Sequence, residues 1–124
     1  MNRIFLSIGS NAAERDQNVM KCMDWIAGHF TALAKSDIYT TPAINGKDND
    51  YTNSVMEIES ELEHDDLKAQ FKQHEKDCGR IPESKALGIV PIDIDIVTWN
   101  DEILKPSDYS REYFQKGWRQ ITSK

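Results

Sequence analysis

The segment Pro91–Val97, with the sequence PIDIDIV, constrains the fold most strongly because apolar and acidic residues alternate along it. This period of two predicts a β-strand with one buried face and one polar face. Asp93 and Asp95 then share a face, about 6.6 Å apart along the strand, where their carboxylates repel each other. Such a pair suits a divalent cation such as Mg²⁺, which bridges carboxylates to substrate phosphates. The alternative is an edge strand with a solvated acidic face.

The size and composition of the chain are typical of one soluble globular domain. Its 124 residues can bury a core without disulfides, and 39% hydrophobic with 29% charged residues is an ordinary balance. The net charge of −6 argues against a general nucleic-acid-binding protein. No apolar stretch is long enough to span a membrane, and the amino terminus lacks a signal-peptide pattern. We therefore expect a single domain over residues 1–124 that is cytoplasmic and monomeric.

Hydrophobic periodicity divides the chain into strands and helices. The predicted strands are Ile4–Ile8, Thr31–Thr41, Tyr51–Glu59 and the acidic strand, and the predicted helices are Glu14–His29 and Glu63–Cys78. Glu102–Leu104 suggests a further short strand, and a short helix near Arg111–Lys116 with a polar tail should follow. This order predicts an α+β, ferredoxin-like βαββαβ fold. Its four-stranded antiparallel sheet would carry the helices on one face and end in a short C-terminal extension.

The predicted topology also places the acidic pair. The first and fourth strands should be central neighbours, so Asp93 and Asp95 should lie in mid-sheet on the face away from the helices, or near the sheet's end beside the loops. The apolar stripe of the second helix should consist of Leu67, Phe71, His74 and Cys78. We expect both cysteines, Cys22 included, to be reduced and buried, as is usual in a cytosolic chain.

Five short motifs occur in a fixed order along the chain. They are Ile8–Asn11 (IGSN), Tyr39–Pro42 (YTTP), Asp50–Asn53 (DYTN), Glu75 with Gly79-Arg80, and Asp93–Ile96 (DIDI). Each motif is weak alone, but five in register are specific. Together they resemble 6-hydroxymethyl-7,8-dihydropterin pyrophosphokinase, a ferredoxin-like enzyme of folate biosynthesis, and the resemblance extends from about Ile4 to Leu104.

The resemblance implies a reaction in which pyrophosphate passes from ATP to the hydroxymethyl group of a reduced pterin, releasing AMP. ATP would be the co-substrate, and Asp93 and Asp95 would bind two Mg²⁺ ions, with Arg80 also catalytic. Two metal ions can hold both the attacking and the leaving oxygens of such a transfer. The small-molecule partners would therefore be a pterin and ATP.

The resemblance also implies which residues bind each substrate. The pterin side would comprise Thr41, Pro42, Ile44, Tyr51 and Asn53. The nucleotide side would comprise Glu75, Arg80, Ile96 and Arg111. Each residue also has an ordinary structural explanation: Tyr51 as a packed sheet aromatic, Asn53 as a polar cap, and Arg111 as an exposed helix residue.

Residues 80–90 depart from the family pattern, which has a basic, tryptophan-containing loop there. This chain has Pro82, Leu87 and Val90 at the positions concerned and keeps only Arg80 and Lys85 as cations. Each bidentate arginine–phosphate contact contributes on the order of 1.5–3 kcal/mol, so losing two or three would weaken transition-state stabilisation. Beyond this loop, the family's Pro-His pair is also missing.

Three functions are consistent with this pattern. The first is an active but divergent pyrophosphokinase. The second is a catalytically degenerate relative that binds a pterin-like ligand or a protein partner without pyrophosphate transfer, and the third is a related enzyme with another acceptor. The affinity for ATP distinguishes the first from the second.

Overall fold

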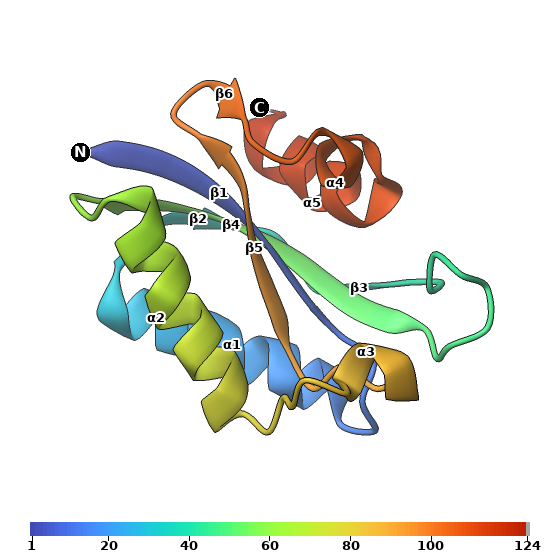
Figure 1. Ribbon diagram of the computed structural model, residues 1–124. Helices are drawn as coiled ribbons and strands as arrows, with labels where there is room; N and C mark the ends of the chain where they lie inside the picture. Colours follow the sequence, from blue (N-terminus) through green and yellow to red (C-terminus); the bar gives the residue numbers. More distant parts are fainter. Residues whose placement is uncertain (124) are drawn as a thin grey trace.

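The computed structural model describes residues 1–123 and contains a six-stranded antiparallel sheet (Figure 1). The strands are β1 (Asn2–Ser10), β2 (Thr31–Lys35), β3 (Tyr39–Thr41), β4 (Tyr51–Ser60), β5 (Asp93–Trp99) and β6 (Glu102–Ile103). Five of them follow the order β2-β4-β1-β5-β6, and β3 also pairs with β4. The first predicted strand and the acidic strand, β1 and β5, are therefore neighbours in the middle of the sheet, as predicted.

The predicted number of four strands is wrong because the edge strand expected at Thr31–Thr41 is interrupted. At Ser36 the N–H donates to the Val55 carbonyl and the Oγ accepts from the Val55 N–H, each at 2.9 Å. The serine side chain thus replaces a backbone carbonyl, and local hydrogen bonds of this kind compete with regular strand pairing. The interruption separates β2 from β3, and the two-residue β6 completes the six strands.

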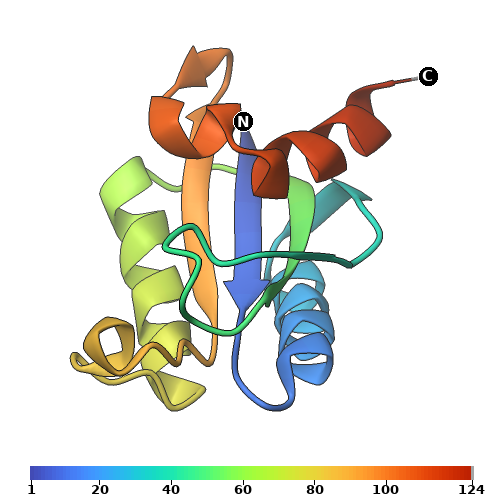
Figure 2. The ribbon, with the colours of Figure 1, turned by 90° about the vertical axis from the view of Figure 1, so that its right-hand side faces the viewer.

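The two long predicted helices lie on one face of the sheet, as predicted, and the helices of the C-terminal extension lie on the other face (Figure 1). The helices are α1 (Arg15–His29), α2 (His64–Asp77), α3 (Ser84–Leu87), α4 (Pro106–Ser110) and α5 (Glu112–Thr122). Figure 1 shows α1 and α2 on one side of the strands and α4 and α5 on the other. In Figure 2, α4 and α5 cross only the end of the sheet where β1 begins. None of these helices has the length and apolar character needed to cross a bilayer.

The larger core lies between the sheet and helices α1 and α2. Alternate residues of β1, namely Ile4, Leu6 and Ile8, are fully buried there, as period-two patterning requires. Fully burying a side chain of this kind contributes about 1.5–3 kcal/mol. On the opposite face, α4 and α5 pack near the beginning of β1, and the segment between β3 and β4 crosses in front of the strands farther along (Figure 2).

Helix α2 buries a different stripe from the predicted one. Leu67, Phe71 and Glu75, spaced four residues apart, face the sheet. His74 instead stacks on Trp25 of α1, with ring centroids 3.9 Å apart. Cys78 is exposed, so the prediction that it is buried is wrong, whereas Cys22 is buried and both thiols are free.

A second, smaller core attaches α5 to the other face and depends on a glycine. It is formed by Val55, Val97 and Phe114, all fully buried. A Cβ atom added at Gly117 of α5 would lie 2.7 Å from Val55 Cγ2 and 2.8 Å from the Tyr39 hydroxyl oxygen. That hydroxyl donates to the Tyr113 carbonyl at 2.5 Å and accepts from the Gly117 N–H at 3.1 Å. Only glycine allows α5 to approach β4 this closely.

We predict that Gly117→Ala destabilises the protein by up to about 2 kcal/mol. Overpacking a core contact lowers the free energy of unfolding by about 1–3 kcal/mol, and the better helix propensity of alanine offsets about 1 kcal/mol of this loss. Gly28→Ala in α1 is the matched control, because no atom lies within 4 Å of its added Cβ. That variant should instead be stabilised by a few tenths to about 1 kcal/mol. Urea denaturation of both variants measures the difference, and equal changes of the same sign would contradict the packing argument.

Candidate active site

Three adjacent strands bring the acidic pair next to residues predicted to bind the pterin. Gly9 of β1 pairs with Asn53 of β4 on one side and with Asp93 of β5 on the other. Directly opposed residues project from the same face of a sheet, so Asn53, Gly9 and Asp93 form one row. Ser7 and Asp95 lie opposite each other in the next row. This is the face away from α1 and α2, as predicted.

At Gly9 the row has no side chain, and neighbouring side chains pack closely around this buried position. A Cβ atom there would lie 3.1 Å from Asn53 Oδ1 and 3.5 Å from Tyr51 Cδ2. The amide nitrogen of Asn53 donates to Thr41 Oγ1 at 2.6 Å, which fixes the side chain beside Gly9. The structure therefore brings Thr41, Tyr51 and Asn53 together. The other two predicted pterin residues, Pro42 and Ile44, are exposed on the loop that follows β3.

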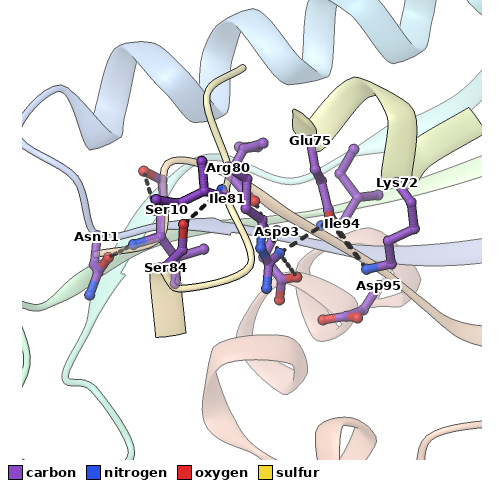
Figure 3. Close-up of polar contacts among 12 residues, drawn as sticks. Ser10, Asn11, Lys72, Glu75, Arg80, Ile81, Ser84, Asp93, Ile94 and Asp95 are labelled. Atoms are coloured by element: carbon purple, nitrogen blue, oxygen red, sulfur yellow. Dashed lines mark hydrogen bonds and ion pairs between the residues drawn. The ribbon is translucent and has the colours of Figure 1, made fainter. Parts of the chain in front are cut away.

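The segment containing Ser10 and Asn11 holds the neighbouring loop in place. Asn11 is buried, its amide donates to the Gly88 carbonyl at 2.8 Å, and its Oδ1 accepts from the Val90 N–H at 2.6 Å. Ser10 Oγ donates to the Val90 carbonyl at 3.3 Å. This end of β1 thus fixes the chain immediately before the acidic strand (Figure 3).

Asp93 belongs to an ion-pair cluster with Arg80 and Glu75 (Figure 3). Arg80 Nη1 lies 2.6 Å from Asp93 Oδ1 and 3.1 Å from Glu75 Oε1. Burial favours the neutral acid at Asp93, but hydrogen bonds from Asp95 and Arg80 outweigh it and lower the pKa of Asp93. The predicted catalytic arginine therefore contacts one of the two predicted metal ligands.

Glu75 is almost completely buried and supports the acidic strand from α2. Its Oε2 accepts a hydrogen bond of 2.8 Å from the Ile94 N–H. This N–H is at the outer edge of β5, where β6 does not reach, because β6 pairs only with Thr98 and Trp99. Burial raises the pKa of Glu75, against the opposing effect of this hydrogen bond. Glu75 thus satisfies a strand edge that would otherwise be unpaired.

Asp95 is paired with a cation that the sequence did not reveal. Lys105 Nζ lies 2.7 Å from Asp95 Oδ1. Lys105 is positioned by a register shift in β5, where the Val97 carbonyl accepts hydrogen bonds from the Leu104 and Lys105 N–H groups. Burial, followed by the charge of Asp93, raises the pKa of Asp95 to about 7, and Lys105 only partly offsets this. In the absence of a metal ion, Asp95 therefore ionises less readily than an ordinary aspartate.

The donor set at this position fits Mg²⁺. Two adjacent carboxylates supply hard oxygen ligands, and their mutual repulsion is relieved by a divalent cation. In residues 1–123, no group of three or more His, Cys, Asp or Glu side chains is arranged to hold a metal ion. Asp93 and Asp95 would therefore share the ion with water and with substrate oxygens, which is the usual mode of Mg²⁺ binding in phosphoryl-transfer sites.

A cavity of about 390 Å³ opens beside Asp95, between α2 and the hairpin of β5 and β6. Its lining includes the predicted nucleotide residue Ile96, together with Asp95 and Trp99. Glu75 and Arg80 lie next to it in the ion-pair cluster. Arg111, the fourth residue predicted on the nucleotide side, is exposed at the start of α5 and does not line the cavity.

Sequence reasoning missed three lysines in this cavity, Lys68, Lys72 and Lys105. One signal was present, because Lys68 and Lys72 are four residues apart and share a helix face. Lys105 had no such signal, since its approach to Asp95 depends on the register shift at Val97.

Comparisons with known proteins show a family and two relatives. Residues 5–123 match the family model described as 7,8-dihydro-6-hydroxymethylpterin-pyrophosphokinase. Over 108 residues the chain is 29% identical to "Folic acid synthesis protein FOL1" of Dictyostelium discoideum, covering 86% of this chain and 16% of that protein. Over 106 residues it is 26% identical to the "2-amino-4-hydroxy-6-hydroxymethyldihydropteridine pyrophosphokinase" of Aquifex aeolicus, covering 85% of this chain and 66% of that protein.

We predict that Asp95→Asn stabilises the metal-free protein at neutral and alkaline pH. The pKa of Asp95 is about 7 in the folded state and 3.8 as its ordinary value, so this group stabilises the fold only while it is protonated. Its contribution is lost as the pH rises from about 4 to 7, by up to about 1.4 kcal/mol per pH unit. The asparagine variant does not suffer this loss, so its advantage should grow over that range and stay constant above it.

Urea denaturation between pH 4 and pH 8 with a chelator present measures this advantage. Asp24→Asn, on the exposed face of α1, controls for the removal of one carboxylate. An Asp95→Asn advantage that is the same at pH 5 and pH 8 would contradict the assignment.

Proposed function

Because the chain belongs to the 7,8-dihydro-6-hydroxymethylpterin-pyrophosphokinase family, we propose that it transfers pyrophosphate from ATP to 6-hydroxymethyl-7,8-dihydropterin in folate biosynthesis. The hydroxymethyl oxygen attacks the β-phosphorus of ATP and loses its proton. The bond from the β-phosphorus to the bridging oxygen breaks, and AMP leaves with the α-phosphate. The row formed by Asn53, Gly9 and Asp93 is the observation that carries this proposal.

The row supports a specific position for the pterin. Asn53 and Asp93 are two strand spacings apart, about 9.6 Å, with Gly9, which has no side chain, between them. A flat bicyclic ring can lie over Gly9 because no side chain occupies that position. Asn53, held by Thr41, would pair with the ring, since an amide both donates and accepts hydrogen bonds. The hydroxymethyl group would then point toward Asp93 and Asp95.

Tyr51, Pro42 and Ile44 complete the proposed pterin site. Tyr51 lies beside Gly9, and its burial and the nearby charge of Asp93 raise its pKa, so it stays neutral and can pack against the ring. Pro42 and Ile44 lie on the segment after β3, which Figure 2 shows crossing in front of the sheet. Ile44 is exposed, so an apolar ligand surface beneath it would remove it from water.

The cavity beside Asp95 supports the nucleotide position. Its volume of about 390 Å³ is within the usual range for small-molecule sites. It contains apolar surface from Ile96 and Trp99 for a base, and its acidic end lies at Asp95. A triphosphate placed there approaches the proposed pterin position from the other side of the Asp93 and Asp95 pair.

The acidic pair would hold the metal ions between the two substrates. Mg²⁺ bound by Asp93 and Asp95 would neutralise phosphate charge and polarise the transferred group. Arg80, fixed by Glu75, orients Asp93 and adds positive charge on the phosphate side, and we also assign Arg111 to that side. We further propose that the protein acts as a monomer in the cytoplasm, where free thiols remain reduced.

Release of AMP from ATP in the presence of the reduced hydroxymethylpterin tests the transfer. We expect Asp95→Asn to lower kcat on the order of 10²–10³-fold, because it removes a metal ligand and its electrostatic contribution. Pterin affinity should change little, and Asp24→Asn should match the wild type. Pterin binding without any AMP release from the wild-type protein would instead favour the catalytically degenerate relative.

A second variant tests the pterin position. We predict that Gly9→Ala raises the Kd for the pterin by at least about tenfold, because one misplaced group in a flat ring site costs 1–3 kcal/mol. Affinity for a non-hydrolysable ATP analogue should be unchanged, since Gly9 does not line the nucleotide cavity. Isothermal titration with each ligand separates the two effects, and Gly28→Ala controls for adding a methyl group. Wild-type pterin affinity in Gly9→Ala would rule out the proposed position over Gly9.

A further inference from the structure

The cavity beside Asp95 concentrates positive charge in an acidic protein. Three of its lining side chains are the lysines at 68, 72 and 105, whereas Asp95 and Glu102 are the only acidic ones. The whole chain carries a net charge of −6. Glu75 and Asp95 pair with Lys72 and Lys105 in the ligand-free protein, so these charges are partly neutralised. Because the three lysines lie around one cavity, the phosphates of a polyanionic ligand can compete with the carboxylates for them.

We propose that Lys68, Lys72 and Lys105 bind the phosphates of ATP and supply the positive charge that residues 80–90 do not provide. This inference rests on the proposed function, since it assigns residues to the nucleotide of that reaction. A lysine ammonium binds phosphate as a compact point charge and makes charge-assisted hydrogen bonds.

The loop next to the site provides only part of this charge. Residues 80–90 contain two cations, Arg80 and Lys85. Arg80 is held by Glu75 and Asp93 through contacts of 3.1 and 2.6 Å. Lys85 is exposed on α3 and does not line the cavity. The cavity lysines are therefore the cations best placed for a triphosphate.

Along the cavity, two of the lysines lie between Trp99, where a base could pack, and the acidic pair. Helix α2 runs antiparallel to β5, because His64 at its start lies against Trp99, with ring centroids 5.6 Å apart, and Glu75 near its end bonds to Ile94. Lys68 and Lys72 occupy the two turns between these points. A nucleotide with its base against Trp99 would therefore extend its phosphates past both lysines toward Asp95.

The present partners of the lysines are compatible with release to a ligand. Within residues 1–123, no carboxylate lies within ion-pair distance of Lys68, which is exposed. Lys72 lies 3.3 Å from Glu75, a carboxylate that Arg80 also pairs with. Lys105 pairs with Asp95, the carboxylate that would be committed to Mg²⁺ in the loaded site. Phosphate oxygens would then replace Asp95 as the partner of Lys105.

Calorimetric titration of the whole chain with α,β-methylene-ATP and Mg²⁺, and separately with adenosine, tests this assignment. We expect Lys68→Met and Lys72→Met each to raise the Kd for the ATP analogue about tenfold. This change is at the lower end of the range that a hydrogen bond to a charged group contributes to binding. Adenosine affinity should stay within about twofold of wild type, because adenosine has no phosphate. Lys72→Arg should restore most of the affinity for the analogue.

Lys76→Met is the matched control, since this lysine is exposed on the same helix outside the cavity. Unchanged affinity for the analogue in Lys68→Met and Lys72→Met would overturn the assignment. An equal loss for adenosine would also overturn it, because the lysines would then shape the cavity rather than bind phosphate. If the wild-type protein releases AMP, neither of these two results contradicts the proposed function. Lysine-dependent binding without AMP release would refute the transfer and leave this assignment standing.

Discussion

The repulsion between Asp93 and Asp95 is the constraint around which the site is organised. Two carboxylates on one face of a central strand destabilise the fold unless neighbouring groups compensate. Arg80 compensates at Asp93, Lys105 at Asp95, and the proton favoured at Asp95 reduces the charge further. Glu75 holds the strand edge between them through the Ile94 N–H. These contacts come from α2, from the loop after it and from the segment after β6. Three separate parts of the chain therefore stabilise the same pair of carboxylates.

Two glycines shape the sheet face that carries the acidic pair. Gly117 of α5 allows this helix to pack directly on Val55, near the beginning of β1. Gly9 lies at the other end of β1, between Asn53 and Asp93, and adds no side chain to that row. The C-terminal helices thus stabilise the sheet without occupying the substrate face. A longer contact of α5 along β4 would bury the row that the proposed reaction requires.

Local patterns in the sequence predicted the strands of the central sheet and the shared face of the acidic pair, because period-two burial determines these features. The order of the elements predicted that the first strand and the acidic strand are neighbours. Local patterns did not predict the interruption at Ser36, where one side-chain hydroxyl replaces a backbone partner. The packing of α5 was missed because it depends on a close approach at Gly117, and glycine has no hydrophobic signal of its own. In the site, the structure brings together residues that the family resemblance named, and their roles remain predictions: Thr41, Tyr51, Asn53, Glu75, Arg80, Asp93, Asp95 and Ile96. Lys105 was not, since a register shift between strands leaves no local pattern.

The exchange of loop arginines for cavity lysines has a physical consequence for how the site works. Arginine on a loop is pre-organised for bidentate contact with phosphate but must be carried there by loop closure. Lys68 and Lys72 project from a helix whose face is fixed by Leu67 and Phe71 in the core, so their charge is present before any loop moves. Each lysine contact is less directional than an arginine fork. A site built this way depends less on closure and more on the net charge of its cavity, so salt should weaken nucleotide binding here by screening.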